Sequence, residues 1–267
     1  MSTQIHPTAV VDSAVDLGGE VRIGPYAVIE AGCVIGDYCE VRAHAVICKG
    51  TLMGPRNQIG YGAVIGAEPQ DYGYKGGRTW VEIGSGNKIR EYATIHRAST
   101  EGTATSIGND NFIMCGVHIG HDCEVGDRTI LANNALLGGF VKVEDGAFLG
   151  GATIVHQHTR IGRLAITRGG TRLGKDVPPF FMATDTNEVS GINRIGLRRA
   201  GLSHETRRAI QAAFELIYRS NLNVTQALEE LQHKFHLAEI AHLAEFIKSS
   251  KRGFCRAERS ARAEEEE

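Results

Sequence analysis

The sequence predicts a mainly β fold, a left-handed parallel β-helix of hexapeptide repeats followed by a C-terminal α-helical domain. Apolar residues recur every six positions, glycine is frequent while aromatic residues are few, and helical spacing appears only after Pro178 and Pro179. We expect the β-helix to span residues 1–190 and the helical domain residues 191–255. Residues 256–267 lack periodicity and are expected to form a disordered tail.

The six-residue repeat begins at Ile5 and keeps one phase to Leu173. Positions in this register hold Ile, Val, Leu or Met, except at Asp71, Gly77, Glu101 and Thr167. A period of six fits neither an α-helix nor the two-residue alternation of an ordinary strand. It indicates a solenoid, in which each unit buries its apolar row against its neighbours.

The residues around each apolar anchor indicate the shape of one coil. Glycine often follows the anchor, as after Ile23 and Ile59, and it suits a tight corner because it tolerates backbone angles that other residues avoid. Aromatic residues make up 6% of the chain, so the core must consist of small and β-branched side chains. Three repeats then form one triangular coil of eighteen residues, and the coils stack at about 4.8 Å.

Two segments leave this register without changing its phase. The first covers residues 71–82 and the second about residues 97–106. Loops that leave a rigid scaffold often carry binding chemistry, so we expect both to border the functional site.

Three apolar stripes at helical spacing follow the β-helix. The first stripe belongs to a helix that Ser203 can cap. The stripes consist of Ile210, Phe214, Ile217 and Tyr218, then Val224, Leu228, Leu231 and Phe235, and then Leu237, Ile240, Ala244 and Ile247.

Composition and charge exclude several classes of function. A net charge of −2 argues against a nucleic-acid-binding protein. The N-terminal segment lacks the features of a signal peptide, and no stretch approaches the ~18 apolar residues of a membrane span. The six cysteines include no C-x-x-C pair, and Cys33, Cys39 and Cys123 fall at small inward positions. We therefore expect a reduced cytoplasmic protein whose cysteines are structural.

A cluster of histidines falls at one corner of the predicted coil. His118 ends one repeat and His121 is third in the next, so the two flank a corner. Gly139 lies one coil beyond His121, and Gln157, beside His156, lies one coil further. A neutral imidazole can remove a proton from a hydroxyl near pH 7, and a glycine amide can stabilise an oxyanion. The cluster therefore favours acyl-transfer chemistry over a set of merely solvated histidines.

A zinc site is a second hypothesis for the same histidines, as in a hydratase resembling the γ-class carbonic anhydrases. Zinc requires about three convergent nitrogen or sulfur ligands. His118, His121, His156 and His158 supply them only if their ring directions converge. A non-catalytic scaffold is a third hypothesis, but it leaves the histidine corner without a purpose. We expect no metal and no cofactor.

Eight short stretches, in order, carry a resemblance to a known family. They are Ile5–Ala9 (IHPTA), Pro69–Asp71 (PQD), Ile95–Arg97 (IHR), His118–Cys123 (HIGHDC), Leu131–Ala135 (LANNA), Val155–Gln157 (VHQ), Asp176–Pro179 (DVPP) and Leu216–Ser220 (LIYRS). From about Ile5 to Arg256 the chain resembles the UDP-N-acetylglucosamine O-acyltransferases, which begin lipid A synthesis. The repeats alone would indicate only the broad acyltransferase superfamily, which also includes CoA-dependent acetyltransferases.

The resemblance implies a homotrimer with active sites between subunits. It implies transfer of a 3-hydroxyacyl chain from acyl carrier protein to the 3-position of UDP-GlcNAc. His121 matches the general base of the family, Asp122 the residue that orients it, and Gly139 the oxyanion amide. Gly169 matches the end of the acyl groove, where glycine favours a longer chain. The remaining matches to the nucleotide-sugar and acyl-donor site are Gln70, Asp71, His96, His118, His156, Gln157, Asn193 and Arg199.

Several positions depart from the family pattern. Gly73 stands where lysine is usual, with Lys75 two residues further on, and Ile195 and Ala200 replace charged residues. These changes concern the sugar, uracil or phosphate contacts, so they leave the acceptor less defined than the reaction.

Two further departures form a pair. Phe140 stands where a histidine is usual, and His158, one coil away, stands where a phenylalanine is usual. We expect His158 to replace the missing imidazole in part.

Because the general base is unchanged, either the 3-hydroxyl of UDP-GlcNAc or a 3-amino analogue fits as acceptor. The related N-acyltransferase carries an N-terminal uridine-binding domain, for which repeats that begin at Ile5 leave no room.

Overall fold

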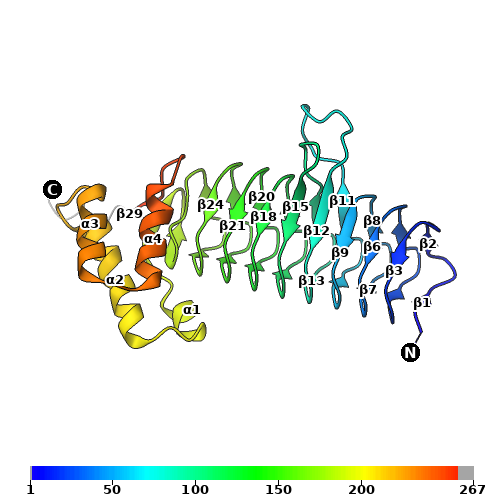
Figure 1. Ribbon diagram of the computed structural model, residues 1–267, viewed down its shortest axis with the longest axis horizontal. Helices are drawn as coiled ribbons and strands as arrows, with labels where there is room; N and C mark the ends of the chain where they lie inside the picture. Colours follow the sequence, from blue (N-terminus) through cyan, green and yellow to red (C-terminus); the bar gives the residue numbers. More distant parts are fainter. Residues whose placement is uncertain (1, 258–267) are drawn as a thin grey trace, which may run out of the picture.

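A computed structural model describes residues 2–257 of the chain. Three sheets form the faces of a long triangular prism, with helices at its C-terminal end (Figure 1). Successive short strands go to sheets A, B and C in turn, so each sheet receives every third strand. This arrangement confirms the predicted left-handed parallel β-helix.

The strand bounds follow the six-residue repeat. Sheet A contains β1 (Gln4–Ile5), β4 (Arg22–Ile23), β7 (Glu40–Val41), β10 (Gln58–Ile59), β13 (Lys88–Ile89), β16 (Phe112–Ile113), β19 (Ile130–Leu131), β22 (Phe148–Leu149), β25 (Ile166–Thr167), β27 (Phe181–Thr184), β28 (Glu188–Ile192) and β29 (Arg256–Ala257). Sheet B contains β2 (Val10–Val11), β5 (Val28–Ile29), β8 (Val46–Ile47), β11 (Val64–Ala67), β14 (Thr94–His96), β17 (His118–Ile119), β20 (Leu136–Leu137), β23 (Ile154–Val155) and β26 (Arg172–Leu173). Sheet C contains β3 (Asp16–Leu17), β6 (Val34–Ile35), β9 (Thr51–Met53), β12 (Trp80–Ile83), β15 (Ala104–Ile107), β18 (Glu124–Val125), β21 (Lys142–Val143) and β24 (Arg160–Ile161).

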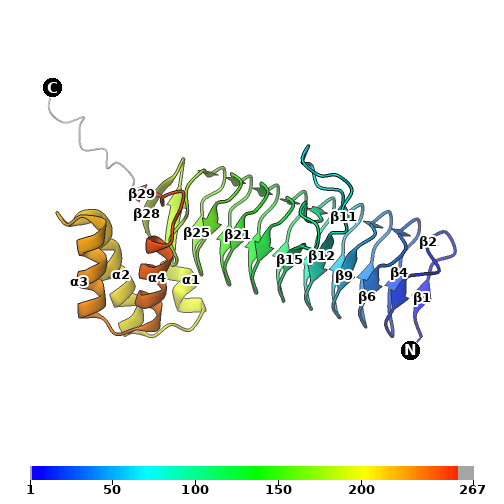
Figure 2. The same cartoon turned by 45° about the horizontal axis from the view of Figure 1, so that its top comes forward.

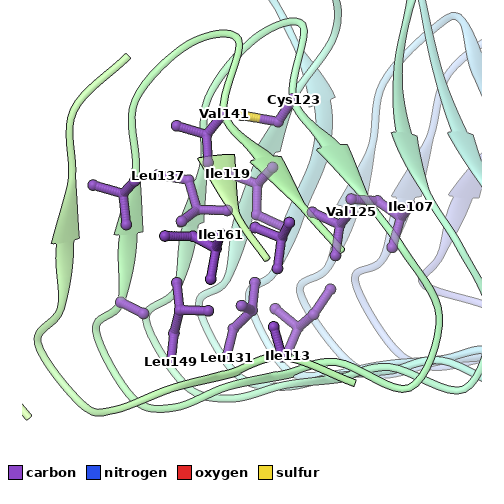
Figure 3. Packing of buried hydrophobic residues seen from close by; sticks show 14 of the residues in the cluster. Ile107, Ile113, Ile119, Cys123, Val125, Leu131, Leu137, Val141, Leu149 and Ile161 are labelled. Carbon is purple, nitrogen blue, oxygen red and sulfur yellow. The ribbon is translucent and has the colours of Figure 1, made fainter. Parts of the chain in front are cut away.

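The interior of the prism is a column of buried aliphatic side chains. Ile119, Leu137 and Val155 stack from successive coils of sheet B, and each is at most 1% exposed. Figure 3 shows the equivalent side chains of the neighbouring sheets pointing into the same interior. The second inward position is filled by small residues such as Cys123 and Val141, as the repeat predicted.

A ladder of buried amides runs along one edge of the prism. The Asn57 carboxamide oxygen accepts from the Asn87 backbone amide at 2.8 Å, and the Asn87 oxygen accepts from Asn111 at 2.9 Å. The Asn111 oxygen in turn accepts from the Thr129 hydroxyl at 2.8 Å. Because buried amides are costly unless they are paired, this ladder stabilises a single register between coils.

Both excursions leave the prism at the edge between sheets B and C, called here the B/C edge. The first spans residues 68–79, between β11 and β12, and the second spans residues 97–103, between β14 and β15. They therefore end three residues earlier than predicted. The coils that contain them are lengthened to 30 and 24 residues, which are whole multiples of six, so the phase is kept. The longer excursion projects from the prism beside β11 and β12 (Figure 1).

Four helices follow the hairpin of β27 and β28. The predicted stripes correspond to α2 (His204–Arg219), α3 (Val224–Lys234) and α4 (Ala238–Lys248). Ser203 caps α2 as predicted and accepts from the Thr206 amide at 3.0 Å. The short helix α1 (Arg194–Arg199) was not predicted. Figure 2 shows the four helices gathered beyond the last coils.

The C-terminal end of the described chain returns to the β-helix. Strand β29 pairs with β28, so Arg256 and Ala257, the first residues of the predicted tail, belong to sheet A. The rest of the predicted tail, residues 258–267, lies outside the described residues. Over residues 2–257, no helix is both long and apolar enough to span a membrane.

Candidate active site

Most of the predicted site residues meet in one groove on the B/C edge. This groove, called here the histidine groove, has a volume of about 360 Å³. It is lined by Gln70, His96, His118, Gly120, His121, Gly138, Gly139, Val155, His156 and Gln157. His121, Gly139 and Gln157 come from three successive stacked coils, as the eighteen-residue spacing predicted. Gln70 is contributed by the first excursion.

His121 and Asp122 form a hydrogen-bonded dyad at the corner after β17. The imidazole Nδ1 lies 2.8 Å from Asp122 Oδ2, and the two side chains are 11% and 7% exposed. Asp122 has a φ of 58°, which aspartate tolerates better than most residues. Asp122 thus bonds Nδ1, while the His121 ring lines the histidine groove.

The second excursion holds the Asp122 carboxylate. Oδ2 accepts from the Ser99 hydroxyl at 2.7 Å and from the Ser99 backbone amide at 3.0 Å. Burial alone would raise the pKa of Asp122, but the hydrogen bonds from Ser99 and His121 outweigh it and lower the pKa. The sequence pointed to this excursion as a region but not to Ser99, because a repeat register does not specify the path of a loop outside the coil.

Gly139 lies directly against the imidazole of His121. A Cβ at this position would lie 2.5 Å from Cε1 and 2.6 Å from Nε2, so only glycine fits here while the ring keeps its place. The Gly139 amide donates to no acceptor among residues 2–257. The position therefore combines close access to Nε2 with an uncommitted N–H group in the groove.

His118 and His96 form an uncharged wall beside the dyad. Burial lowers the pKa of His118 to about 4, with smaller contributions from His96 and His121, and burial also lowers the pKa of His96. The rings meet edge to face with their centroids 5.2 Å apart. His118 Nδ1 lies 2.9 Å from the Thr94 hydroxyl, and His96 Nδ1 donates to the Glu68 carbonyl. Both imidazoles are thus neutral hydrogen-bonding groups near pH 7.

A buried arginine ties the first excursion to the coil. Arg97 is 3% exposed, and its guanidinium donates to the Gly66 carbonyl and to Glu68 Oε1, each at 2.9 Å. It also lies over the Tyr74 ring, 5.7 Å from the centroid. These contacts fix the base of the loop that brings Gln70 into the groove.

Asp71 and the two departures near it lie outside the histidine groove. Asp71 accepts from the Gly73 amide at 2.7 Å and so closes a turn of its own loop. Lys75 Nζ donates to the Tyr72 carbonyl at 3.3 Å. Neither side chain reaches the groove in this arrangement.

Three predicted site residues lie away from the B/C edge. Gly169 is at the edge between sheets A and B, called here the A/B edge. Asn193 is buried as the N-cap of α1, where it accepts from the Gly196 amide at 2.9 Å and donates to the Leu164 carbonyl at 2.9 Å. Arg199 is exposed in the last turn of the same helix.

Phe140 and His158 stack as the eighteen-residue spacing predicted. Their ring centroids are 4.6 Å apart at an interplanar angle of 15°. Phe140 also meets the His121 ring edge to face at 5.3 Å. Phe140 and His158 line a neighbouring groove of about 570 Å³ together with Asp122, rather than the histidine groove.

The described residues offer neither reactive thiols at Cys33 and Cys123 nor a set of metal ligands. Burial raises the pKa of Cys33 to about 11 and that of Cys123 to about 12, so both are inert apolar side chains. Within residues 2–257, no group of three or more His, Cys, Asp or Glu is arranged to hold a metal ion. The zinc hypothesis therefore lacks a ligand set in the described part of the chain.

The β-helix of hexapeptide coils places the chain in the class of hexapeptide-repeat transferases. Residues 14–49 and 104–139 match the profile of the bacterial transferase hexapeptide repeats. Residues 176–255 match the profile of UDP N-acetylglucosamine O-acyltransferase, domain 2.

Full-length relatives identify the family. An acyl-[acyl-carrier-protein]–UDP-N-acetylglucosamine O-acyltransferase from Thermodesulfovibrio yellowstonii is 43% identical over 95% of this chain and 99% of its own. The crystal structure of a UDP-N-acetylglucosamine acyltransferase from Bacteroides fragilis superposes with a TM-score of 0.91 at 38% identity, covering 95% of this chain and 100% of the other. The Francisella novicida enzyme gives 0.90 at 38% identity, covering 95% and 94%. The chain belongs to the acyl-[acyl-carrier-protein]–UDP-N-acetylglucosamine O-acyltransferase family.

Proposed function

We propose that this protein transfers a 3-hydroxyacyl chain from acyl carrier protein to the 3-hydroxyl of UDP-GlcNAc, with His121 as general base. The observation that carries the proposal is the position of His121, whose Nδ1 is bonded to Asp122 at 2.8 Å while its ring lies against Gly139 in the groove. The relatives' names supply the acyl-carrier-protein donor and the UDP-N-acetylglucosamine acceptor. The 3-hydroxyacyl chain and the role in lipid A synthesis follow from the family resemblance.

The proposed reaction uses three groups in sequence. Asp122 accepts from Nδ1–H of His121 and thereby keeps Nε2 unprotonated, so that Nε2 can take the proton of the sugar hydroxyl as its oxygen attacks the thioester carbonyl. The Gly139 N–H donates to the oxyanion that forms. When the tetrahedral intermediate collapses, the C–S bond breaks and the leaving thiolate of the carrier takes the proton from His121.

The neutral imidazoles beside the dyad suit an uncharged sugar. His96 and His118 are neutral, so they can donate or accept hydrogen bonds without adding a positive charge next to His121. Such a charge would oppose the protonation of His121. Gln70 from the first excursion and His156 and Gln157 from the next coil complete the same groove. We assign this groove to the sugar and to the carbonyl end of the acyl chain.

The distribution of the predicted site supports a homotrimer. His121 lies at the B/C edge, whereas Gly169 lies at the A/B edge and Asn193 and Arg199 belong to the end of the chain that carries the helices. A site between subunits would bring the B/C edge of one copy together with the A/B edge and helix α1 of the next. We propose that the acyl chain ends at a neighbouring subunit's Gly169.

The acceptor is the least constrained part of the proposal. Gly73 offers no cation, Ile195 is 59% exposed, and Ala200 is the exposed C-cap residue of α1. A 3-amino analogue of UDP-GlcNAc is the second candidate, because a neutral amine could use the same base and yield an amide.

We place the enzyme in the cytoplasm, in keeping with six free cysteines in the chain.

A product assay tests the proposal. Purified protein is incubated with 3-hydroxyacyl carrier protein and either UDP-GlcNAc or its 3-amino analogue, and the acylated sugar nucleotide is measured by mass spectrometry. We expect product from UDP-GlcNAc that disappears in His121→Ala. Product only from the amino sugar would establish an N-acyltransferase instead, and no product from folded trimeric protein with either sugar would overturn acyl transfer to a UDP-sugar.

A further inference from the structure

The second excursion reaches back to the dyad through one side chain. Ser99 lies three residues after the end of β14, and both its hydroxyl and its backbone amide donate to Asp122 Oδ2. This is the same oxygen that bonds His121 Nδ1. One carboxylate oxygen therefore accepts from the base and from the excursion together.

The neighbouring hydroxyl of the excursion does not share this role. Thr103 Oγ1 lies 3.3 Å from Asp122 Oδ1, but it donates its single proton to the Thr100 carbonyl at 2.7 Å. On the other side of the corner, the Asp122 amide donates to Thr105 Oγ1 at 2.8 Å, which fixes the backbone and not the carboxylate. Among the described residues, Ser99 and His121 are thus the side chains that direct protons at Oδ2.

The other ionisable groups around the dyad are neutral, paired with each other or lie in the neighbouring groove. His96 and His118 face it from the groove side and are uncharged near pH 7. The charged or titratable groups behind it, in the neighbouring groove and at the corner, are Cys123, Glu124, Lys142, His158, Arg160, Asp176, Lys251 and Arg252. Lys142 is paired with Glu124 at 2.7 Å and Arg160 with Asp176 at 2.9 Å, so neither is directed at Asp122.

We propose that Ser99 is a positioning residue for the general base: its hydroxyl fixes the Asp122 carboxylate and moderates the attraction of that carboxylate for the His121 proton. This inference rests on the proposed function for its effect on catalysis, but not for its effect on His121. An oxygen that accepts from Ser99 has less negative charge to offer the imidazolium. When the hydroxyl is removed, the carboxylate stays bonded to the Ser99 amide and stabilises protonated His121 more strongly, while one hydrogen bond fewer fixes its orientation for catalysis.

The first test is a titration that does not require turnover. The His121 imidazole is followed by 13C NMR in the full-length protein, with the signal assigned from its absence in His121→Asn. In Ser99→Ala the His121 titration should move to higher pH by about half a unit to one unit. An unchanged or lower midpoint would overturn the proposal, whether or not the protein proves to be an acyltransferase.

The second test measures the pH dependence of acyl transfer. In Ser99→Ala the acidic limb of the kcat/KM profile should shift to higher pH, together with the His121 titration. At the plateau kcat should fall roughly threefold to tenfold, while KM changes little. A loss of kcat that is uniform with pH would indicate a merely structural residue and would overturn the assignment. If no variant or wild-type protein turns over, the proposed function fails, and the NMR titration still decides the role of Ser99.

Matched variants isolate the hydroxyl. Ser99→Thr keeps the hydroxyl and should give the wild-type profile. Ser99→Val has the shape of Ser99→Thr without the hydroxyl and should show the shift predicted for Ser99→Ala. It therefore tests the hydroxyl even if Ser99→Ala folds poorly. Thr100→Ala, at an exposed position on the same excursion, should match wild type. Equal pH profiles for the threonine and valine variants would contradict the proposal.

Discussion

The B/C edge and the A/B edge of the prism share one backbone but differ in chemistry. At each edge a corner residue adopts a left-handed conformation, with φ of 58° at Asp122 and 59° at Asn134. At the B/C edge these corners carry the dyad, the histidines and both excursions. At the A/B edge the equivalent positions in the same coils are Gly116, Asn134, Ala152 and Gly170. The repeat therefore determines where a side chain points, while the residue placed at each corner determines what it does.

The largest expected difference concerns the imidazoles of the two edges. His121→Ala should lower kcat by about 10²- to 10⁴-fold, since it removes the group that takes the proton. His44→Ala removes an exposed histidine of the A/B edge that stacks on Tyr26, and it should leave kcat unchanged. Steady-state kinetics of both variants check this, and equal losses would remove the distinction between the edges.

The next difference concerns glycine. In Gly139→Ala the added methyl would lie 2.5 Å from His121 Cε1, so the ring must shift, and a displacement of this size can cost about 100-fold in kcat. Gly174→Ala is the matched control, because its methyl meets nothing closer than Asn187 Oδ1 at 3.7 Å. Kinetics and a crystal structure of each variant measure the effect, and a fully active Gly139→Ala would show that His121 does not need a glycine at this position.

The A/B edge has its own expected role, which is to limit the acyl chain. A side chain at position 169 would point toward the Gly151 carbonyl, which lies 3.3 Å from an added Cβ. Gly169→Met should therefore shift the preference to shorter donors by about tenfold in relative kcat/KM. Competition between donors of two lengths measures this shift. The His121 titration should not change, and a changed titration with unaltered chain preference would place Gly169 at the wrong end of the substrate.

The third edge, between sheets C and A, provides the smallest effect. His242 of α4 bonds Glu144 at 2.8 Å, and this hydrogen bond raises the pKa of His242. A raised pKa in the folded state gives stability that is present below the unfolded pKa of about 6.5 and is lost as the pH rises through the folded value. Because both groups are partly exposed, we expect roughly 0.5 kcal/mol.

Urea unfolding at pH 6 and pH 9 measures this contribution. The difference between wild type and His242→Gln should be present at pH 6 and absent at pH 9. A difference of the same size at both pH values would show that packing of α4, rather than the charge on His242, provides the stability.

The sequence predicted the coil and most of the groove because both follow from one period. His118, His121, Gly139 and Gln157 meet as the eighteen-residue spacing required. Ser99 was missed because its excursion lies outside that register. The helix α1 was missed because six residues are too few for an apolar stripe.

The residues assigned from family resemblance behave differently from those assigned by spacing. Within one chain, three of them lie away from the histidine groove: Gly169, Asn193 and Arg199. For Gly169 the eighteen-residue spacing gives the same result, because it places this residue at the A/B edge. In the proposed homotrimer their roles would depend on a neighbouring subunit, and a repeat within one chain carries no information on how copies meet. The assignments of these three residues stay predictions.

The amide ladder from Asn57 to Thr129 restricts how such a protein can change in length. Each amide bonds to the coil above or below it, so inserting or deleting a single residue would leave buried polar groups unpaired and turn every later side chain out of line. Only additions in multiples of six residues keep the alignment, and the two coils that carry excursions, of 30 and 24 residues, have such lengths. Loops can therefore be enlarged beside the groove in fixed steps, and whole coils can be added before Asn57, while the spacing between His121 and Gly139 is preserved.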